Sequence, residues 1–419
     1  MKILFKDIDV PGLTSLGVYE GKGGYQALKK AFAQKPEEIV EIVKASGLRG
    51  RGGAGFPAGL KWSFLAKDVF PRYLVCNADE SEPGTCKDRE LLEKNPHLLI
   101  EGMILTSYAC RVSKAYIYFR GEFQHAADLM DKAIEEAYAK GYLGKNVMGS
   151  GMDLDLYTHL GAGAYICGEE SALLNSLEGR RGEPRLKPPF PAVEGLYAKP
   201  TVVNNVETLS VVPWIVNEGA DKYAAIGTEK SKGTKLVSVS GHVKKPGNYE
   251  IIMGMSTREI IYDLAGGIRG DNKLKAFIPG GSSTPMLPAD KVDVGYDYES
   301  IAAAGSMLGS GALIVMDHTV NVVEATLRLS YFYMHESCGK CTPCREGTRW
   351  MWQILGKLQA GIGTNGHVDK LLDICDNMSF KCFCPLGDAA VGPVASSIKY
   401  FRSDYEELVK KLRGGAVSV

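Results

Sequence analysis

The stretch Tyr73–Gly84, YLVCNADESEPG, joins a short apolar run to a polar loop. The apolar run predicts a buried strand. The loop carries one amide and three carboxylates, from Asn77, Asp79, Glu80 and Glu82. Open α/β sheets bind ligands in the loops at the carboxyl ends of their strands, where such side chains can bond ribose hydroxyls or ring edges. A solvated turn explains the same residues, so this loop alone does not decide the function.

Strands alternate with helices on both sides of this stretch. Apolar residues at helical spacing predict a helix in KPEEIVEIVKASGL, 35–48, with Gly47 at its end. The segments 115–119 and 152–160 predict strands, and the segment 122–141 between them predicts a helix. This alternation is typical of an α/β layer fold. The segment 180–200 is rich in Pro and Gly and is expected to lie outside regular structure.

A glycine-rich loop, RGRGGAGFPAGLKW at 49–62, precedes the strand. Its G-x-G-x-x-G match at 50–55 is not the dinucleotide fingerprint, which needs a strand before it, and no Walker Gly-Lys-Ser/Thr follows. Glycines nevertheless let backbone approach a ligand closely, and exposed N–H groups favour anions. A flexible turn with one core aromatic residue is the alternative. Arg51 and Lys61 add positive charge there, and three aromatic residues in or just after the loop could contact a planar ring: Phe56, Trp62 and Phe64.

A third loop, GAGAYICGEES at 161–171, joins glycines to Tyr165 and to a pair of carboxylates, Glu169 and Glu170. The carboxylates open a predicted helix, and negative charge is favourable at a helix start, so capping explains part of the pattern. Three glycine-rich or acidic loops that each follow or flank a predicted element are harder to explain separately. We expect them to converge on one pocket.

The pattern changes after Gly233. KLVSVSG, NYEII, KAFIPGG and ALIVMD predict short strands, and STREIIYDLAGG between them begins with a capping box formed by Ser256 and Glu259. This combination predicts a small α+β domain. From Asn321 onward, periodic apolar residues with few strand signals predict a helical bundle.

Six of the ten cysteines lie within this predicted bundle. Cys338, Cys341 and Cys344 form a C-x-x-C-x-x-C run, which with one remote cysteine is typical of a cubane iron–sulfur cluster. Structural zinc, which more often uses two separated C-x-x-C pairs, is the alternative. The fourth ligand could be Cys375, Cys382 or Cys384, and spacing does not select among them. Cys375 occupies an apolar helical position, which favours a role in the core.

The composition is that of a globular protein. The 419 residues are enough for two to three domains. Lys plus Arg and Asp plus Glu each number 49, so no basic excess argues for nucleic acid. The start, MKILFKDIDV, is too polar for a signal peptide, and no apolar run approaches the length of a membrane span. We therefore expect a soluble, unexported protein.

Five motifs in this order closely resemble the NADH-binding flavoprotein subunit of respiratory complex I, NADH:quinone oxidoreductase. Related subunits occur in NAD-linked hydrogenases and formate dehydrogenases. The motifs are RGRGGAGFPAGLKW, CNADESEPGT, GAGAYICGEES, PTVVNNVET and ESCGKCTPCREG. The resemblance covers nearly the whole chain. It implies an α/β fold with a Rossmann-like FMN- and NADH-binding domain at 1–232, a β-grasp (ubiquitin-like) domain at 233–320 and a helical bundle with a [4Fe–4S] cluster at 321–419.

The resemblance also implies the site residues. It makes the cysteine before Leu-Gly-Asp the fourth cluster ligand, so the implied set is Cys338, Cys341, Cys344 and Cys384, and Cys382 departs from the residue expected there. The implied FMN contacts are Gly50, Gly52, Lys61, Asn77, Asp79, Glu80, Gly168, Asn204 and Asn205. The implied NADH contacts are Phe56, Phe64, Glu82, Tyr165, Glu170 and Phe190. Arg51, Gly53, Glu169 and Thr208 complete the cofactor-binding set.

The resemblance implies that two carboxylates, Glu82 and Glu170, are the catalytic residues. They would lie near the ribose or the hydride-transfer face. A negative Glu170 would also disfavour a ribose 2′-phosphate, which favours NADH over NADPH.

The implied activity is NADH oxidation, in which hydride passes to FMN and single electrons pass to the cluster. The implied partners are a small [2Fe–2S] thioredoxin-like subunit, a large iron–sulfur subunit and, indirectly, a membrane arm, with no nucleic acid. The implied place is the inner, cytoplasmic face of the cell membrane. A diaphorase subunit of an NAD-linked hydrogenase, formate dehydrogenase or electron-bifurcating complex is one alternative. A zinc-stabilised scaffold is another, but it leaves the three loops unexplained.

Overall fold

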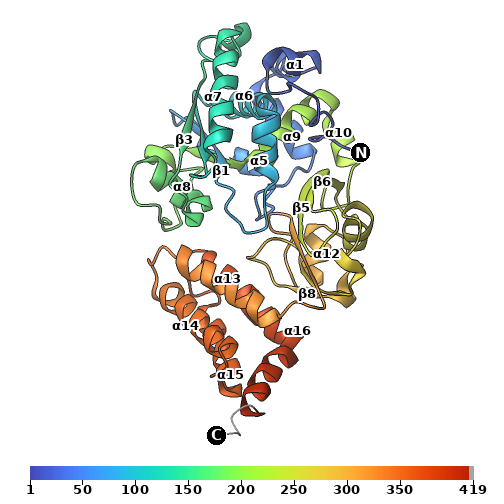
Figure 1. Cartoon of the computed structure of the whole chain (residues 1–419). Helices are drawn as coiled ribbons and strands as arrows, with labels where there is room; N and C mark the ends of the chain where they lie inside the picture. The colour runs from blue at the N-terminus through green and yellow to red at the C-terminus, as the bar shows by residue number, and fades with distance from the viewer. Residues whose placement is uncertain (415–419) are drawn as a thin grey trace. The chain divides into compact units, whose positions relative to one another are not determined.

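The computed structural model describes residues 1–414, which form two compact units. Unit 1 comprises residues 1–81, 85–237 and 248–255, and unit 2 comprises 82–84, 238–247 and the described residues from 256 onward. Each unit contains a hydrophobic core made of its own residues. The described helices and strands are labelled in Figure 1. No helix among residues 1–414 combines the length and the apolar character that crossing a bilayer requires.

Unit 1 is built on a parallel sheet. Its described strands are β1 (Tyr73–Ala78), β2 (Lys114–Phe119), β3 (Asp155–Leu160) and β4 (Thr201–Asn205). The strand order is β3-β2-β1-β4, and every pairing is parallel. The chain first adds β2 and β3 on one side of β1 and then places β4 on the other side. The direction of winding therefore reverses between β1 and β4, where α/β folds bind ligands beyond the carboxyl ends of the strands.

Helices surround this sheet. Those described in unit 1 are α1 (Leu16–Gly21), α2 (Gln26–Phe32), α3 (Pro36–Ala45), α4 (Ala58–Ser63), α5 (Lys87–Lys94), α6 (Pro96–Cys110), α7 (Gln124–Ala139), α8 (Glu170–Leu177), α9 (Val206–Glu218) and α10 (Ala220–Ala224). Short 3₁₀ turns occur at η1 (Val147–Gly149), η2 (Tyr165–Gly168) and η3 (Leu196–Ala198). The predicted strands and the helices around 35–48 and 122–141 are present, and the predicted α/β class is confirmed.

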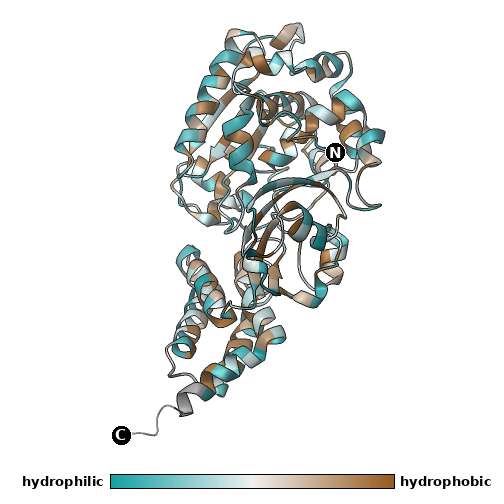
Figure 2. Cartoon of the chain, turned by 45° about the vertical axis from the view of Figure 1, so that its right-hand side comes forward, coloured by the Kyte–Doolittle hydropathy of each residue, from teal (hydrophilic) through white to brown (hydrophobic). Residues whose placement is uncertain are grey.

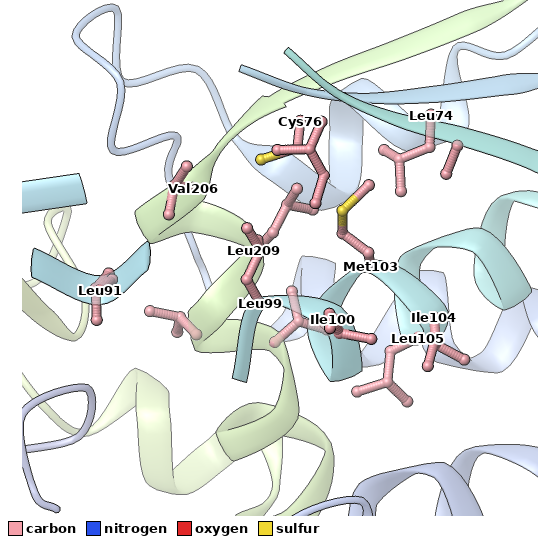
Figure 3. Packing of buried hydrophobic residues seen from close by; sticks show 14 of the residues in the cluster. Leu74, Cys76, Leu91, Leu99, Ile100, Met103, Ile104, Leu105, Val206 and Leu209 are labelled. Carbon is pink, nitrogen blue, oxygen red and sulfur yellow. The ribbon is translucent and has the colours of Figure 1, made fainter. Parts of the chain in front are cut away.

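The core of unit 1 explains why α6 and α9 lie beside β1. Leu74 and Cys76 are two residues apart on β1 and therefore point to the same face of the sheet. Figure 3 shows them beside Met103 of α6 and Leu209 of α9. All four side chains are fully buried. Burial of this apolar surface fixes the start of α9, and with it the end of β4, relative to β1.

Unit 2 begins with a small mixed sheet. The later half of β5 (Thr234–Gly241) pairs in parallel with β9 (Ala312–Asp317), and β7 (Leu274–Ile278) runs antiparallel to both β9 and β8 (Leu287–Pro288). The residues of β6 (Gly247–Ile252) after Gly247 belong to unit 1. The short helical segments are α11 (Thr257–Glu259), η4 (Ile260–Leu264), η5 (Arg269–Asp271), η6 (Ala289–Lys291) and α12 (Tyr298–Ala303). Ser256 and Glu259 form the predicted capping box at α11.

The rest of unit 2 is helical. The helices described there are α13 (Val322–Glu336), α14 (Thr342–Gln359), α15 (Asn365–Met378) and α16 (Leu386–Gly414). Each helix packs against its neighbours in this group. Figure 2 shows hydrophilic and hydrophobic residues on the same helices, as expected of amphipathic helices that bury one face. The predicted helical region is therefore present.

Candidate functional site

The loop after β1 contacts the loop before α8. The Asn77 amide donates to the carbonyl oxygen of Gly168 at 2.9 Å, and its own oxygen accepts the backbone N–H of Asp79 at 3.0 Å. A Cβ atom at Gly168 would lie 3.4 Å from the Asp79 carboxylate, in ordinary contact with it. Gly168 and Asp79 are therefore direct neighbours.

The glycine-rich loop lies against the start of α9. Its Arg51 N–H donates to the Thr208 hydroxyl at 2.8 Å. A Cβ atom at Gly52 would lie 3.0 Å from Cβ of Asn205, closer than nearly all such contacts in proteins. The three loops that the sequence singles out thus meet at the carboxyl ends of β1 and β4 in unit 1.

Lysines on two segments hold the acidic pair at the start of α8. Glu170 binds Lys61 at 2.8 Å and Lys187 at 3.0 Å, and Lys187 also binds Glu169 at 2.9 Å. Burial alone would raise the pKa of Glu170, but Lys61 and Lys187 outweigh it and lower that pKa. Glu169 is the N-cap of α8 and accepts two backbone N–H groups. The two adjacent acids therefore have different tasks: Glu169 caps the helix, and Glu170 presents a negative charge between two lysines.

Glu80 caps a different helix. Its carboxylate accepts the backbone N–H groups of Asp88 at 2.9 Å and Arg89 at 3.0 Å, in the first turn of α5. Burial, followed by the negative charge of Asp88, raises the pKa of Glu80 to about 7. Glu80 therefore both fixes α5 and holds a proton more tightly than an exposed glutamate.

A buried charge network that sequence reasoning missed lies next to Asn205. Asn205 donates to Asp88 at 2.6 Å, and Asp88 binds Lys87 at 2.7 Å. Lys87 and Lys235 share Glu207, at 2.9 Å and 2.6 Å. The signal was present in the sequence as charged residues directly beside two motifs, in TCKDRE and NNVET. A pattern cannot tell such residues from a solvated turn, because only the fold brings them together.

Burial would lower the pKa of Lys87, but the negative charges of Asp88 and Glu207 outweigh burial and raise that pKa. At Lys235 burial outweighs the attraction of Glu207 and lowers the pKa to about 7. Lys87 therefore stays positively charged, 3.3 Å from the Asn205 side-chain oxygen.

The aromatic residues divide into two groups. Phe56, Phe64 and Phe190 are 46%, 52% and 58% exposed, which leaves their rings available to a planar ligand. Trp62 is buried instead, and its indole N–H donates to the Asn204 side chain at 2.8 Å. Trp62 is thus the core aromatic residue of the glycine-rich loop.

Arg51 and Glu82 are placed differently from their neighbours in the sequence. The Arg51 guanidinium is fully buried and donates to the Lys232 carbonyl and the Tyr223 hydroxyl, so it points into the core of unit 1. Glu82 belongs to unit 2, where it accepts hydrogen bonds from the Ser283 N–H at 2.6 Å and the Ser282 hydroxyl at 3.2 Å.

The cysteine motif lies between α13 and the first turn of α14. The Ser337 hydroxyl and the Cys344 sulfur are 3.2 Å apart, and the Phe383 N–H donates to the Cys341 sulfur at 3.4 Å. Burial, with the neighbouring Cys341 and Cys338, raises the pKa of the Cys344 thiol to about 11 despite the Ser337 hydrogen bond. The three motif thiols are therefore close enough to influence one another's charge.

The other cysteines have distinct surroundings. Cys375 is buried in α15, 3.7 Å from the Met351 sulfur, which agrees with the core role expected for it. None of the ten cysteines, all of which lie within residues 1–414, forms a disulfide. Among residues 1–414, no three Cys, His, Asp or Glu side chains surround a position for a single metal ion. A [4Fe–4S] cluster uses its thiolates differently, because each one binds its own iron.

Comparison with known proteins identifies the parts of the chain. The Nuo51 FMN-binding domain matches residues 43–214, the SLBB domain matches 235–315, and the NADH-ubiquinone oxidoreductase-F iron-sulfur binding region matches 324–408. The F subunit of NADH-quinone oxidoreductase of Streptomyces coelicolor is 57% identical over 94% of this chain and 88% of its own length. The corresponding F 2 subunit of Rhizobium meliloti is 50% identical over 98% of both chains. The chain belongs to the family of NADH-quinone oxidoreductase F subunits.

A solved structure shares the fold of this F-type chain. The NAD⁺-reducing [NiFe]-hydrogenase in its H₂-reduced state aligns with 98% of this chain and 67% of its own at 36% identity, with a TM-score of 0.86. The same hydrogenase in its air-oxidized state aligns at 37% identity with a TM-score of 0.84. The family resemblance expected from the sequence is therefore confirmed.

The predicted cofactors of this F-type chain, FMN and a [4Fe–4S] cluster, are confirmed by the two matching regions. The residues present fit both groups. Gly52 lets the backbone of the glycine-rich loop approach Asn205 at the end of β4, and the amides of Asn77 and Asn205 supply polar groups there, as a cofactor with hydroxyl and phosphate groups requires. The grouped thiols of the C-x-x-C-x-x-C run match the donors that a cluster uses. The assignment of individual contact residues stays a prediction.

Proposed function

We propose that this chain is the NADH-oxidising subunit of a respiratory NADH-quinone oxidoreductase. Its relatives of 50–57% identity carry that name, and both cofactor-binding regions are present. When bound, FMN accepts hydride from NADH and the [4Fe–4S] cluster accepts single electrons, so the cofactors supply the redox chemistry. The observation that carries the proposal is the meeting of three polar loops at the point where the sheet reverses its winding.

The chain's own residues orient the two ligands. Backbone at Gly50, Gly52 and Gly53 would approach the cofactor phosphate, and Asn77, Asn204 and Asn205 present amides at the strand ends. Thr208 and Asp79 hold the surrounding loops, and Lys61 contributes positive charge. The exposed rings of Phe56, Phe64 and Phe190, with Tyr165, would stack on the nucleotide.

Carboxylates would set nucleotide specificity. Glu170 is held negative between two lysines, so it would repel a ribose 2′-phosphate and select NADH. Glu82 is proposed to act near the hydride-transfer face, and the hydrogen bonds from Ser282 and Ser283 fix its orientation within unit 2.

A diaphorase subunit of an NAD-linked hydrogenase is the second candidate. The solved hydrogenase aligns with nearly the whole of this chain, which favours a shared NADH-oxidising role. Its 36–37% identity is lower than the 50–57% of the NADH-quinone oxidoreductase relatives, and the respiratory assignment therefore has more support.

The names of the relatives make this chain a subunit of a larger assembly. The proposed partners are a small [2Fe–2S] thioredoxin-like subunit and a large iron–sulfur subunit. Through them the chain would reach a membrane arm at the cytoplasmic face of the cell membrane.

An affinity-tagged chain, purified from its source cells with whatever assembly it belongs to, tests the proposal. Two activities of the same preparation are compared: NADH oxidation coupled to quinone reduction, and NAD⁺ reduction by hydrogen gas. Quinone reduction without a response to hydrogen is the expected result. Hydrogen-dependent NAD⁺ reduction would replace the respiratory assignment with the diaphorase one. A preparation with neither FMN nor iron would reject both.

A further inference from the structure

A short segment between α15 and α16 carries two cysteines, Cys382 and Cys384. The backbone N–H of Phe383, the residue between them, donates to the Cys341 sulfur at 3.4 Å. The peptide unit that joins Cys382 to Phe383 therefore lies directly against a thiol of the C-x-x-C-x-x-C run. Because Cys382 and Cys384 directly precede and follow Phe383, this hydrogen bond keeps the backbone of both cysteines next to the C-x-x-C-x-x-C run.

The Cys382 thiol points into this site. It donates to the Met378 carbonyl oxygen at 3.4 Å, and its sulfur and the Cβ of Cys344 both lie within 4 Å of the position that a Cβ atom at Gly387 would occupy. It is partly buried rather than directed to solvent. The side chain therefore already lies among the groups that bind the cluster.

The first turn of α16 is shaped to accept that thiol. A Cβ atom at Gly387 would lie 2.2 Å from the Cys382 sulfur and 3.8 Å from Cβ of Cys344. No real Cβ atom approaches another atom to 2.2 Å, so any larger residue at 387 would displace Cys382. Gly387 thus leaves the space that the Cys382 sulfur fills, close to the Cβ of Cys344.

We propose that Cys382 is a fifth thiol of the cluster site and becomes the fourth ligand when Cys384 is lost. This inference rests on the proposed function, in that it requires the chain to carry the [4Fe–4S] cluster. The Cys382 thiol releases its proton to water as its sulfur bonds to iron, and no electron is transferred. The C-x-x-C-x-x-C run supplies the other three thiolates in either arrangement.

Replacement of each cysteine by alanine tests the proposal in the full chain, co-produced with its partner subunits. Cys384→Ala is expected to keep about four iron atoms per chain and a [4Fe–4S] EPR signal with shifted g-values. The double variant Cys382→Ala/Cys384→Ala is expected to lose that signal. Cys382→Ala alone is expected to keep the wild-type spectrum. Equal loss of cluster in Cys384→Ala and in the double variant overturns the proposal.

Gly387→Ala provides a matched change that leaves every cysteine in place. Alone it is expected to retain the cluster through Cys384. Combined with Cys384→Ala it is expected to lose the cluster, because the added methyl group displaces the Cys382 sulfur. Retention of the cluster in that combination contradicts the placement of Cys382.

A second measurement does not depend on the folding of any Cys384 variant. Anaerobic loss of iron to a chelator is followed in the wild type, in Cys382→Ala and in the control Cys86→Ala, which removes an exposed thiol of unit 1. Cys382→Ala is expected to lose iron about threefold faster or more, because a spare thiolate rebinds the cluster. Equal rates in all three proteins overturn the inference. A wild type that binds no cluster at all rejects the proposed function instead.

Discussion

Glu170 shows how one side chain can carry specificity. Its carboxylate is held between Lys61 and Lys187, which keep it ionised in a partly buried place. Replacing it with glutamine removes the negative charge but keeps the shape. We expect the ratio of NADPH to NADH kcat/KM to rise by about tenfold or more, because a 2′-phosphate no longer meets a carboxylate. Steady-state kinetics with both nucleotides measure the ratio, with Glu135→Gln, at an exposed position of α7, as the control. An unchanged ratio would count against a nucleotide contact at Glu170.

Glu80 makes stability depend on pH. Its pKa is about 7 in the folded protein against 4.5 in an exposed glutamate, so the folded state binds the proton more tightly. The resulting stabilisation is fully present below pH 4.5 and is lost as the pH rises through 7. The difference in free energy of unfolding between wild type and Glu80→Gln should therefore fall by about 2 kcal/mol between pH 5 and 8.

Urea unfolding at several pH values measures that difference. Glu229→Gln, at an exposed position, is the control and should track the wild type throughout. A Glu80→Gln variant that keeps the wild-type pH dependence would contradict the assignment of this proton to Glu80.

Individual residues also show where sequence reasoning stops. The segment CNADESEPGT predicted a strand end followed by a polar loop, and both are present, because such a pattern is readable locally. It did not show that Asn77 bonds Gly168, that Glu80 caps α5, or that Glu82 bonds Ser283. Two of these partners lie far along the chain, and a sequence pattern carries no information about such distant donors. The residue types were predictable, but their tasks required the fold.

At the scale of elements, α6 explains the main gap in the prediction. Nearly all its residues are buried, so it has no polar face and no helical periodicity to detect. Amphipathic helices such as α3 and α7 were readable because solvent covers one side of each. The strands β1, β2 and β3 were likewise predicted from short apolar or alternating runs. A helix enclosed on all sides is thus the element that sequence periodicity misses.

The contact between α6 and α9 gives a prediction at the same scale. A Cβ atom at Gly102 in α6 would lie 2.1 Å from the Leu209 carbonyl oxygen in α9. Gly102→Ala should therefore separate the two helices and lower the free energy of unfolding by about 2 kcal/mol. Because α9 begins directly after Asn205, FMN affinity should fall as well. Gly17→Ala in α1 meets no atom within 4 Å and is the control. Equal stability of the two variants would contradict the close packing.

At the scale of the whole molecule, the two units divide the chemistry. The FMN-binding region, residues 43–214, lies in unit 1 except for residues 82–84, and the iron–sulfur region lies in unit 2. Each unit has its own core. Loss of the cluster should therefore leave the fold of unit 1 intact and preserve the two-electron reaction with NADH while it abolishes the one-electron pathway.

Cys338→Ala tests this division. The variant should lack the [4Fe–4S] EPR signal and lower quinone reductase activity about a hundredfold or more, because electrons have no route beyond the flavin. NADH should still bleach the flavin absorbance under anaerobic conditions, since Cys338 takes no part in the core of unit 1. Cys86→Ala should behave as the wild type in both measurements. A cluster signal that stays intact in Cys338→Ala and also in Cys338→Ala/Cys382→Ala would remove Cys338 from the ligand set. If the variant binds one FMN per chain but NADH does not reduce it, the two-electron reaction depends on the cluster. The division of chemistry between the two units would then be wrong.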